Sequence, residues 1–326
     1  MRFFRVVEGE PTPRNQLLRA VYHKWHAAMA EGRPDVAQRI ATSGECFNEY
    51  WQPFGSRAHH HADFTSWLEK SGRPLLLSPR QQQDRRRPYH IDLELMVKLT
   101  TRSCELEGSS MSEQDVSVVG RSIAESGIPT FHLAWDCGGA LPSPPRELRQ
   151  KLDFRSAVHI SEAYFHMLAL NLGQGLLLPR DTFYVTEREF LRLHEVLMYP
   201  FHDKSPGKYR SLPIRVTDWD LACFPYPQEL PGLMPRYFKW LETPPEGGHV
   251  HPFLRGCDVA LTTAHLHPFA DGNGRMARLL SSLAMAHGGS RPTLLQQMPR
   301  HVYQRAVHDA QHCGNVVEFY KTCLGT

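Results

Sequence analysis

The segment HPFADGNGRMAR, residues 267–278, brings together residue types that serve phosphate chemistry. Gly272 and Gly274 allow backbone conformations in which successive N–H groups converge, and an apolar helix-forming run follows them. A helix N-terminus offers unpaired N–H donors and the positive end of the helix dipole, which suit an anion. Arg275 and Arg278 are three residues apart, so they would project from one face near that end. The segment therefore predicts a phosphate-binding site.

Two more residues of this segment would complete a site for phosphoryl or nucleotidyl transfer. Asp271 could hold Mg²⁺, an ion that takes one or two protein carboxylates together with phosphate oxygens. His267 stands just before the turn and could accept a proton from an attacking hydroxyl near neutral pH. Acid–base, metal-binding and anion-binding groups then lie together, as this chemistry requires.

Other metal sites fit the residues less well. An EF-hand loop beginning at Asp271 would need glycine where Met276 stands and glutamate where Ser282 stands. Zinc could be sought in HVH (249–251) and HLH (265–267). Residues two apart do not share a helix face, however, and no H-E-x-x-H pattern accompanies them.

The surrounding pattern predicts a mainly α-helical protein. Ser112 with Asp115, and Thr186 with Glu189, resemble capping boxes, and Gly108 is placed like a helix-ending residue. Apolar spacing typical of helices covers 14–42 with a break near residues 32–34, then 91–108, 116–124, 154–171, 186–198, 229–242, 251–265, 275–287 and about 300–323.

The remaining segments predict loops and one small β element. PGKYRSLPIRVTDW, residues 206–219, alternates in polarity and indicates a short hairpin or flap at about 205–218. Turn-forming residues dominate 71–90 and 127–152, and the HHH tract at 59–61 is expected in an exposed loop. The aromatic residues of the first part are expected in the core: Trp25, Phe47, Tyr50, Trp51, Phe54 and Trp67.

Composition limits the class of protein. The chain has 326 residues, 41% of them hydrophobic, which is enough to bury a sizeable core. No secretory signal or membrane-spanning run is recognisable, and a net charge of +3 does not by itself argue for nucleic acid. Seven cysteines without a C-x-x-C pair indicate reduced thiols. We expect a cytoplasmic protein with neither a membrane nor a nucleic-acid partner.

Residues 267–278 match every fixed position of the Fic motif, H-P-F-x-[D/E]-G-N-G-R-x-x-R, so the chain resembles the Fic family. PGKYR, FPYPQELPGLMPRYFKWLE and the C-terminal YQRAVHDAQHCGNVVEFY look familial as well, and the resemblance extends over about 91–323. It implies a Fic-type helical bundle with a small β-hairpin flap. It also implies transfer of AMP from ATP to a Tyr, Thr or Ser hydroxyl of a target protein.

The resemblance also implies roles for single residues. His267 would be the general base, and Asp271 would hold Mg²⁺ or Mn²⁺. The anion site would be formed by Gly272, Asn273, Gly274 and Arg275, and Arg278 would bind the γ-phosphate. Phe269 would be buried and would hold the loop. The flap would dock the target segment by strand addition, through Tyr209, Arg210, Ile214 and Val216.

SCELEG, residues 103–108, resembles the inhibitory pattern [S/T]-x-x-x-E-[G/N] found upstream of some Fic domains. In this interpretation Ser103 and Gly108 frame Glu107, which would pair with Arg278 and keep it from the γ-phosphate. In some relatives this glutamate also positions water for removing AMP. A bifunctional or mainly de-AMPylating enzyme is therefore one alternative, and an ATP-binding regulator without turnover is another.

The resulting organisation has three parts. Residues 1–90 form a helical extension of unassigned role, 91–126 form the inhibitory helix region, and 127–326 form the Fic core. The expected partners are ATP and a protein substrate that the sequence does not name. Self-association, as a homodimer, would influence how firmly the inhibitory helix is held.

Overall fold

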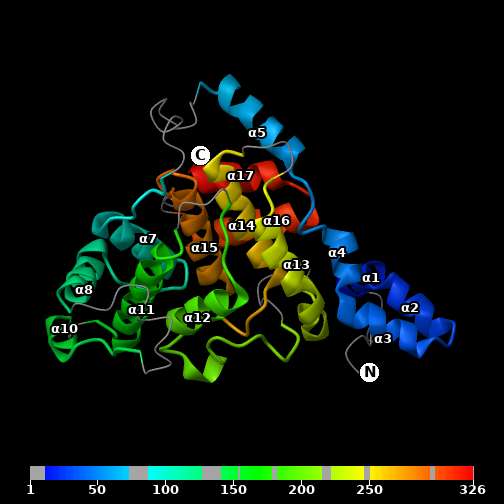
Figure 1. The fold of residues 1–326 in the computed structure, drawn as a ribbon, viewed down its shortest axis with the longest axis horizontal. Coiled ribbons are helices and arrows are strands. Elements are labelled where there is room, and N and C mark those ends of the chain that lie inside the picture. Colours follow the sequence, from blue (N-terminus) through cyan, green and yellow to red (C-terminus); the bar gives the residue numbers. More distant parts are fainter. Residues whose placement is uncertain are drawn as a thin grey trace.

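The structure is a computed structural model that describes residues 12–72, 87–126, 141–152, 155–177, 182–214, 222–245, 250–293 and 298–325. It is mainly α-helical, as the sequence predicts, and the helices are arranged around a central pair (Figure 1). Over these residues the one β pairing is an isolated antiparallel bridge between Tyr209 and Phe269.

The central pair is α14 (Pro252–Leu266) and α15 (Asn273–His287), which pack against each other along their lengths. Both are apolar on nearly all sides, because other helices cover them. The link between them, residues 267–272, carries the first half of the Fic-like segment, and the first turns of α15 carry the rest. The helix pair therefore sets the geometry of the site.

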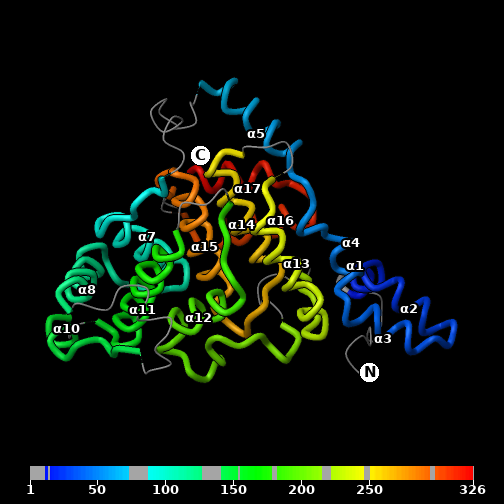
Figure 2. Tube along the Cα trace, in the orientation of Figure 1, coloured from blue at the N-terminus to red at the C-terminus, as the bar shows by residue number. Residues whose placement is uncertain are grey.

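Further helices surround this pair, and the trace in Figure 2 follows them from one side of the molecule to the other. One layer contacts it through α11 and α12, and the C-terminal helices pack onto α14. The bounds of these helices are α7 Leu93–Glu105, α8 Glu113–Glu125, α10 Arg146–Lys151, α11 Ala157–Gln174, α12 Glu187–Leu197, α13 Leu230–Glu242, α16 Arg300–His312 and α17 Val316–Leu324.

The sequence signals at helix ends are confirmed where they were strongest. Ser112 begins α8 and Thr186 begins α12, each in a complete capping box. Gly108 follows α7 with φ 93°, a left-handed conformation that glycine takes without a Cβ penalty.

The N-terminal helices form a small unit at one end of the molecule (Figure 1). They are α1 (Pro13–Val21), α2 (His23–Ala30), α3 (Pro34–Ser43) and α4 (Glu45–Trp51), and they have a cluster of buried side chains of their own. The expected break near residues 32–34 is present. Another lies at Tyr22, which ends α1 and begins α2.

Several expectations for the less regular segments were wrong. The HHH tract lies on α5 (Ala58–Lys70), because the run that follows it supplies a buried face through Phe64 and Leu68. Tyr50 is 47% exposed, since α4 turns it away from the cluster. The stretch 300–323 is two helices, separated where Gly314 takes φ 68°. A helix, α10, lies in the segment expected to be a loop.

Much of the 71–90 and 127–152 segments, and part of the flap, lie outside the described residues. In the described part of the flap the one β pairing is the bridge at Tyr209, so the described residues do not show the expected hairpin. No helix among the residues that the structure describes combines the length and apolar character needed to cross a bilayer.

Candidate active site

His267 lies at the C-terminal end of α14 in a left-handed conformation, with φ 46° and ψ 55°. Its Nδ1 is 3.2 Å from the carbonyl oxygen of Ala264, which can only accept, so Nδ1 carries the proton. Nε2 then has a free lone pair. Burial lowers the pKa of His267 to about 4, so the imidazole is neutral at pH 7 and can accept a proton.

Asn273 closes the loop that follows His267. Its Oδ1 accepts the backbone N–H of Phe269 and its Nδ2 donates to the carbonyl oxygen of the same residue, both at 2.9 Å. The ring of Phe269 is fully buried and stacks on the imidazole of His194 at 3.5 Å. The side chain of Asn273 is therefore used inside the protein, and only its backbone N–H remains to contact phosphate.

A side chain would not fit at Gly272 and would be crowded at Gly274. Gly272 has φ 76°, and a Cβ there would come within 2.5 Å of the sulfur of Met198. A Cβ at Gly274 would lie 3.1 Å from Nη1 of Arg278 and 3.3 Å from Oε1 of Glu107. The first turn of α15 thus presents bare backbone beside these charged groups, as an anion site requires.

Arg275 is held by a glutamate that the sequence analysis missed. Its Nη1 donates to Oε1 of Glu162 on α11 at 2.9 Å, and both side chains are at least 93% buried. Its guanidinium also lies over the ring of Phe201, 5.0 Å from the centroid. Glu162 is the only acidic residue of the mainly apolar helix α11, and a lone buried carboxylate of this kind could have marked it.

Arg278 is bound by two of the three residues that the inhibitory pattern singles out. Nη2 lies 2.6 Å from Oε1 of Glu107, and Nε donates to Oγ of Ser103 at 3.0 Å. Burial alone would raise the pKa of Glu107, but the charges of Arg278 and Arg275 bring it below its ordinary value. Glu107 is therefore ionised at neutral pH.

Asp271 is the carboxylate best placed to hold a metal. Its side chain is 45% exposed and lines the cleft, and Oδ1 accepts the backbone N–H of Gly272 at 2.6 Å. In the described part of the chain no three His, Cys, Asp or Glu side chains gather as a metal site. A single carboxylate beside an anion site fits Mg²⁺, which completes its shell with phosphate oxygens and water.

The flap residues lie at different depths. Tyr209 pairs with Phe269 through the backbone, and its hydroxyl donates to Glu187 at 2.8 Å. The side chain of Arg210 points inward and is 5% exposed, while Ile214 lines the cleft. Val216 lies outside the described residues.

These groups surround one cleft of about 390 Å³, a volume in the range of small-molecule sites. The polar residues of α16 that line it were missed, although their spacing of three to four along the helix could have indicated a shared face. They are Arg300, Gln304, His308 and Gln311. Motif residues on the opposite wall are His267, Asp271, Gly272, Asn273, Gly274 and Arg278.

Comparison with known proteins agrees with this geometry. Residues 184–285 match the model of the Fic/DOC family. A protein adenylyltransferase Fic from Nematostella vectensis is 29% identical over 138 residues, 42% of this chain and 31% of the relative. A protein adenylyltransferase Fic from Culex quinquefasciatus is 28% identical over 157 residues, which are 48% of this chain and 30% of the relative. This chain thus matches less than a third of the length of these relatives.

Among solved structures, a fragment of Fic-1 from C. elegans with one glutamate-to-glycine substitution has a TM-score of 0.50. The two sequences are 16% identical, and the match covers 98% of this chain and 92% of the C. elegans chain. The likeness is therefore one of fold alone. The family match, the complete motif and the loop between the two central helices coincide in one segment. Over residues 184–285 this chain is therefore similar to the Fic/DOC family.

Proposed function

We propose that this protein transfers AMP from ATP to a hydroxyl side chain of a target protein, a Tyr, Thr or Ser. The observation that carries the proposal is one shared cleft. It holds a neutral His267 with a free Nε2, the bare first turn of α15, and the carboxylate of Asp271. The names of the relatives support the same chemistry.

In the proposed reaction Nε2 of His267 takes the proton of the target hydroxyl as its oxygen attacks the α-phosphorus. The bond between the α-phosphorus and its bridging oxygen breaks, and pyrophosphate leaves. Backbone N–H groups of Asn273 and Gly274, in the first turn of α15, stabilise the negative charge that develops on the phosphates. Asp271 would hold Mg²⁺, which supplies positive charge to the phosphates when bound.

The proposal includes inhibition by residues 91–126 acting on the core at 127–326. Arg278 would bind the γ-phosphate, and its Nη2 is bonded to Glu107 and to the carbonyl oxygen of Ser103. The triphosphate would have to compete with these groups. Glu107 therefore keeps ATP out of line for attack while α7 stays in place. The flap, through the backbone near Tyr209 and Ile214, would align the target segment.

De-AMPylation is the second candidate, because the ionised Glu107 lines the same cleft as His267. A carboxylate there could orient water toward an AMP-modified side chain. The third candidate is an ATP-binding regulator, in which the Glu107–Arg278 pair permits binding but no turnover.

The experiment incubates α-phosphate-labelled ATP and Mg²⁺ with the wild type, Glu107→Gly, and Glu107→Gly combined with His267→Ala. We expect label to enter the protein in Glu107→Gly and to disappear in the double variant. If no form takes label although ATP binds, as measured by calorimetry, transfer of AMP is refuted and the regulator is favoured. Release of AMP from a pre-labelled protein by the wild type alone would favour the second candidate.

A further inference from the structure

A hydroxyl of the N-terminal unit reaches a buried carboxylate of the core. The hydroxyl of Tyr22, between α1 and α2, donates to Oε2 of Glu229 at 2.6 Å. Glu229 belongs to the short helix η2 (Pro227–Glu229) that leads into α13, and it is fully buried. Burial raises the pKa of Glu229 to about 7, while the hydrogen bonds from Tyr22 and Tyr226 oppose this rise.

The peptide group between Pro225 and Tyr226 links Glu229 to Arg210. The backbone N–H of Tyr226 donates to the same Oε2 of Glu229 at 2.7 Å. The carbonyl of that peptide group belongs to Pro225, and it accepts a hydrogen bond from Nη2 of Arg210. Because a peptide group is planar and rigid, a shift at Glu229 tilts the carbonyl that Arg210 holds.

Arg210 makes the last step, to the backbone of the proposed base. Its Nε donates to the carbonyl oxygen of His267 at 2.7 Å, and its own N–H donates to that of Pro268 at 2.9 Å. Nη1 reaches the carbonyl of Leu212 at 3.3 Å. A left-handed backbone is unfavourable for a non-glycine residue, so the conformation of His267 depends on such support.

The N-terminal unit is seated tightly enough to transmit a displacement. A Cβ at Gly232 would come within 2.4 Å of the carbonyl oxygen of Ser43, so α3 and α13 touch backbone to backbone. A Cβ at Gly44 would likewise lie 2.4 Å from the side chain of Leu233. Contacts this close leave little room for the unit to slip.

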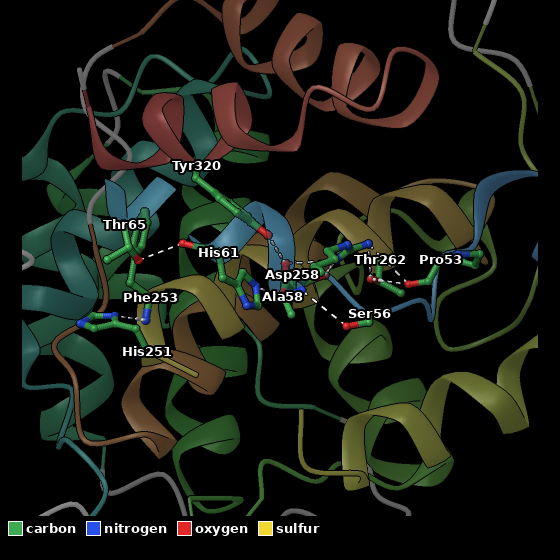
Figure 3. Close-up of polar contacts among 11 residues, drawn as sticks. Pro53, Ser56, Ala58, His61, Thr65, His251, Phe253, Asp258, Thr262 and Tyr320 are labelled. Atoms are coloured by element: carbon green, nitrogen blue, oxygen red, sulfur yellow. Dashed lines mark hydrogen bonds and ion pairs between the residues drawn. The ribbon is translucent and has the colours of Figure 1, made fainter. Parts of the chain in front are cut away.

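A second set of contacts joins the N-terminal part of the chain to α14, the helix that His267 caps. Figure 3 shows Asp258 of α14 at the centre of contacts from the segment that follows α4. Arg57 donates to Oδ1 of Asp258 and to Oγ1 of Thr262, each at 3.2 Å, and His61 lies 2.9 Å from Oδ2. Residues before 72 thus contact both α14 and the segment 225–229, to which Arg210 is hydrogen-bonded.

We propose that Arg210 is the positioning residue of His267 and that the N-terminal unit sets Arg210 through Tyr22 and Glu229. The inference rests on the proposed function, since it concerns the base of that reaction. It assigns to the N-terminal unit control over the rate of the chemical step, with no contact to ATP.

The test uses the full chain carrying Glu107→Gly. To this background are added Tyr22→Phe, Arg210→Lys, or both, with Tyr50→Phe as the control because Tyr50 is an exposed tyrosine of the same unit. The maximal rate of self-labelling, the half-saturating ATP concentration and the melting temperature are measured. The imidazole signals of His267 are followed by NMR and identified by their loss in His267→Ala.

We expect Arg210→Lys to lower the maximal rate about tenfold or more. A lysine ammonium cannot donate to the three separate carbonyl oxygens that the guanidinium of Arg210 reaches. Tyr22→Phe should lower it roughly threefold, with ATP half-saturation unchanged and the His267 signals shifted. The two effects should not multiply, since they act through one chain. Tyr50→Phe should match the background.

Two results would overturn the inference: rate effects that multiply, or Tyr22→Phe lowering the melting temperature while leaving both the rate and the His267 signals unchanged. If the background itself transfers no label, the proposed function fails, and the NMR result alone decides this inference. Shifted His267 signals in Tyr22→Phe would then support it, and unchanged signals would refute it.

Discussion

Nη2 of Arg278 lies 2.6 Å from Oε1 of Glu107, across the first turn of α15, and their side chains are 9% and 22% exposed. A Cβ at Gly274 would lie 3.1 Å from Nη1 of Arg278 and 3.3 Å from Oε1 of Glu107, so the ion pair lies against the first turn of α15. A phosphate arriving there meets a carboxylate before it meets an arginine. In the proposed function this pair would act as a gate, and ATP binding can measure its strength.

The first prediction concerns that strength. In a His267→Ala background, Glu107→Gly should tighten Mg-ATP binding roughly tenfold or more, about 1.4 kcal/mol, because the phosphate no longer competes for Arg278. Glu107→Gln should give a smaller gain, since it removes the charge but keeps a hydrogen-bonding group. Calorimetry measures both dissociation constants. Glu105→Gln, an exposed glutamate at the end of α7, is the control, and equal affinity in Glu107→Gly and the parent would contradict the gate.

The second prediction concerns Glu162 and Arg275. Removing one partner of a buried pair leaves the other charge uncompensated, so Glu162→Ala should lower the free energy of unfolding by about 3–5 kcal/mol. Urea denaturation measures this change. Glu94→Ala, an exposed glutamate of α7, should leave the curve in place. If both variants unfold alike, the Glu162–Arg275 pair does not hold Arg275.

The features that depend on a few consecutive residues were predicted best from the sequence. The two capping boxes, the left-handed Gly108 and the loop between α14 and α15 all depend on neighbours within six residues, and each lies where it was expected. The family segment was likewise recognisable because its motif is continuous.

Features that join distant segments were not predictable in this way. Glu162 and Arg275 are 113 positions apart, and Tyr22 and Glu229 are 207 apart. Their pairing depends on how helices pack, which apolar periodicity alone leaves undetermined. His61 shows the same limit, because only contact with α14 turns a polar tract into part of a buried cluster.

The third prediction concerns this cluster. Asp258 is 4% exposed and accepts from Arg57, His61 and the hydroxyl of Tyr320, the last at 2.6 Å. Asp258→Asn should lower the free energy of unfolding by about 3 kcal/mol, because Arg57 keeps its buried charge without a partner. Tyr320→Phe, which removes one hydrogen bond, should cost about 1 kcal/mol.

Acid should weaken the same cluster. Burial alone would raise the pKa of Asp258, but Arg57 and the hydrogen bonds bring it below its ordinary value. Its contribution to stability is therefore present above the unfolded pKa of about 3.9 and is lost as the pH falls through the lower folded value. In Asp258→Asn the loss of stability below pH 4 should be shallower, and an unchanged slope would contradict the assignment.

The fourth prediction is a pH profile for transfer. The base must be neutral, and burial lowers the pKa of His267 to about 4, so the rate of Glu107→Gly should stay level from pH 8 to about pH 5.5. It should fall as the pH approaches 4. The neutral form is also the one that the fold favours, so this histidine stabilises the protein above its unfolded pKa of about 6.5 and less as acid is added. Circular dichroism at each pH separates unfolding from titration, and a rate that halves near pH 6.5 would contradict the lowered pKa.

The fifth prediction separates the two hydrogen bonds of His194. Nδ1 accepts the N–H of Gly207 at the start of the flap, at 2.9 Å, so Nε2 carries the proton and donates to the carbonyl oxygen of Asp271, at 3.0 Å. An asparagine oxygen can replace Nδ1, and a glutamine nitrogen can replace Nε2. Each of the two substitutions therefore keeps one bond and loses the other.

His194→Asn should raise the Mg²⁺ concentration needed for half-maximal self-labelling about tenfold, because the loop that carries Asp271 loses its support. His194→Gln should leave that concentration nearly unchanged and should speed tryptic cleavage at the exposed Lys208, because the flap loses its anchor. Each variant is thus the control for the other. The asparagine and glutamine variants lose the same stacking on Phe269 and differ only in which hydrogen bond they retain. If both variants shift the Mg²⁺ requirement equally and are cleaved at the same rate, His194 acts only by filling the space beside Phe269.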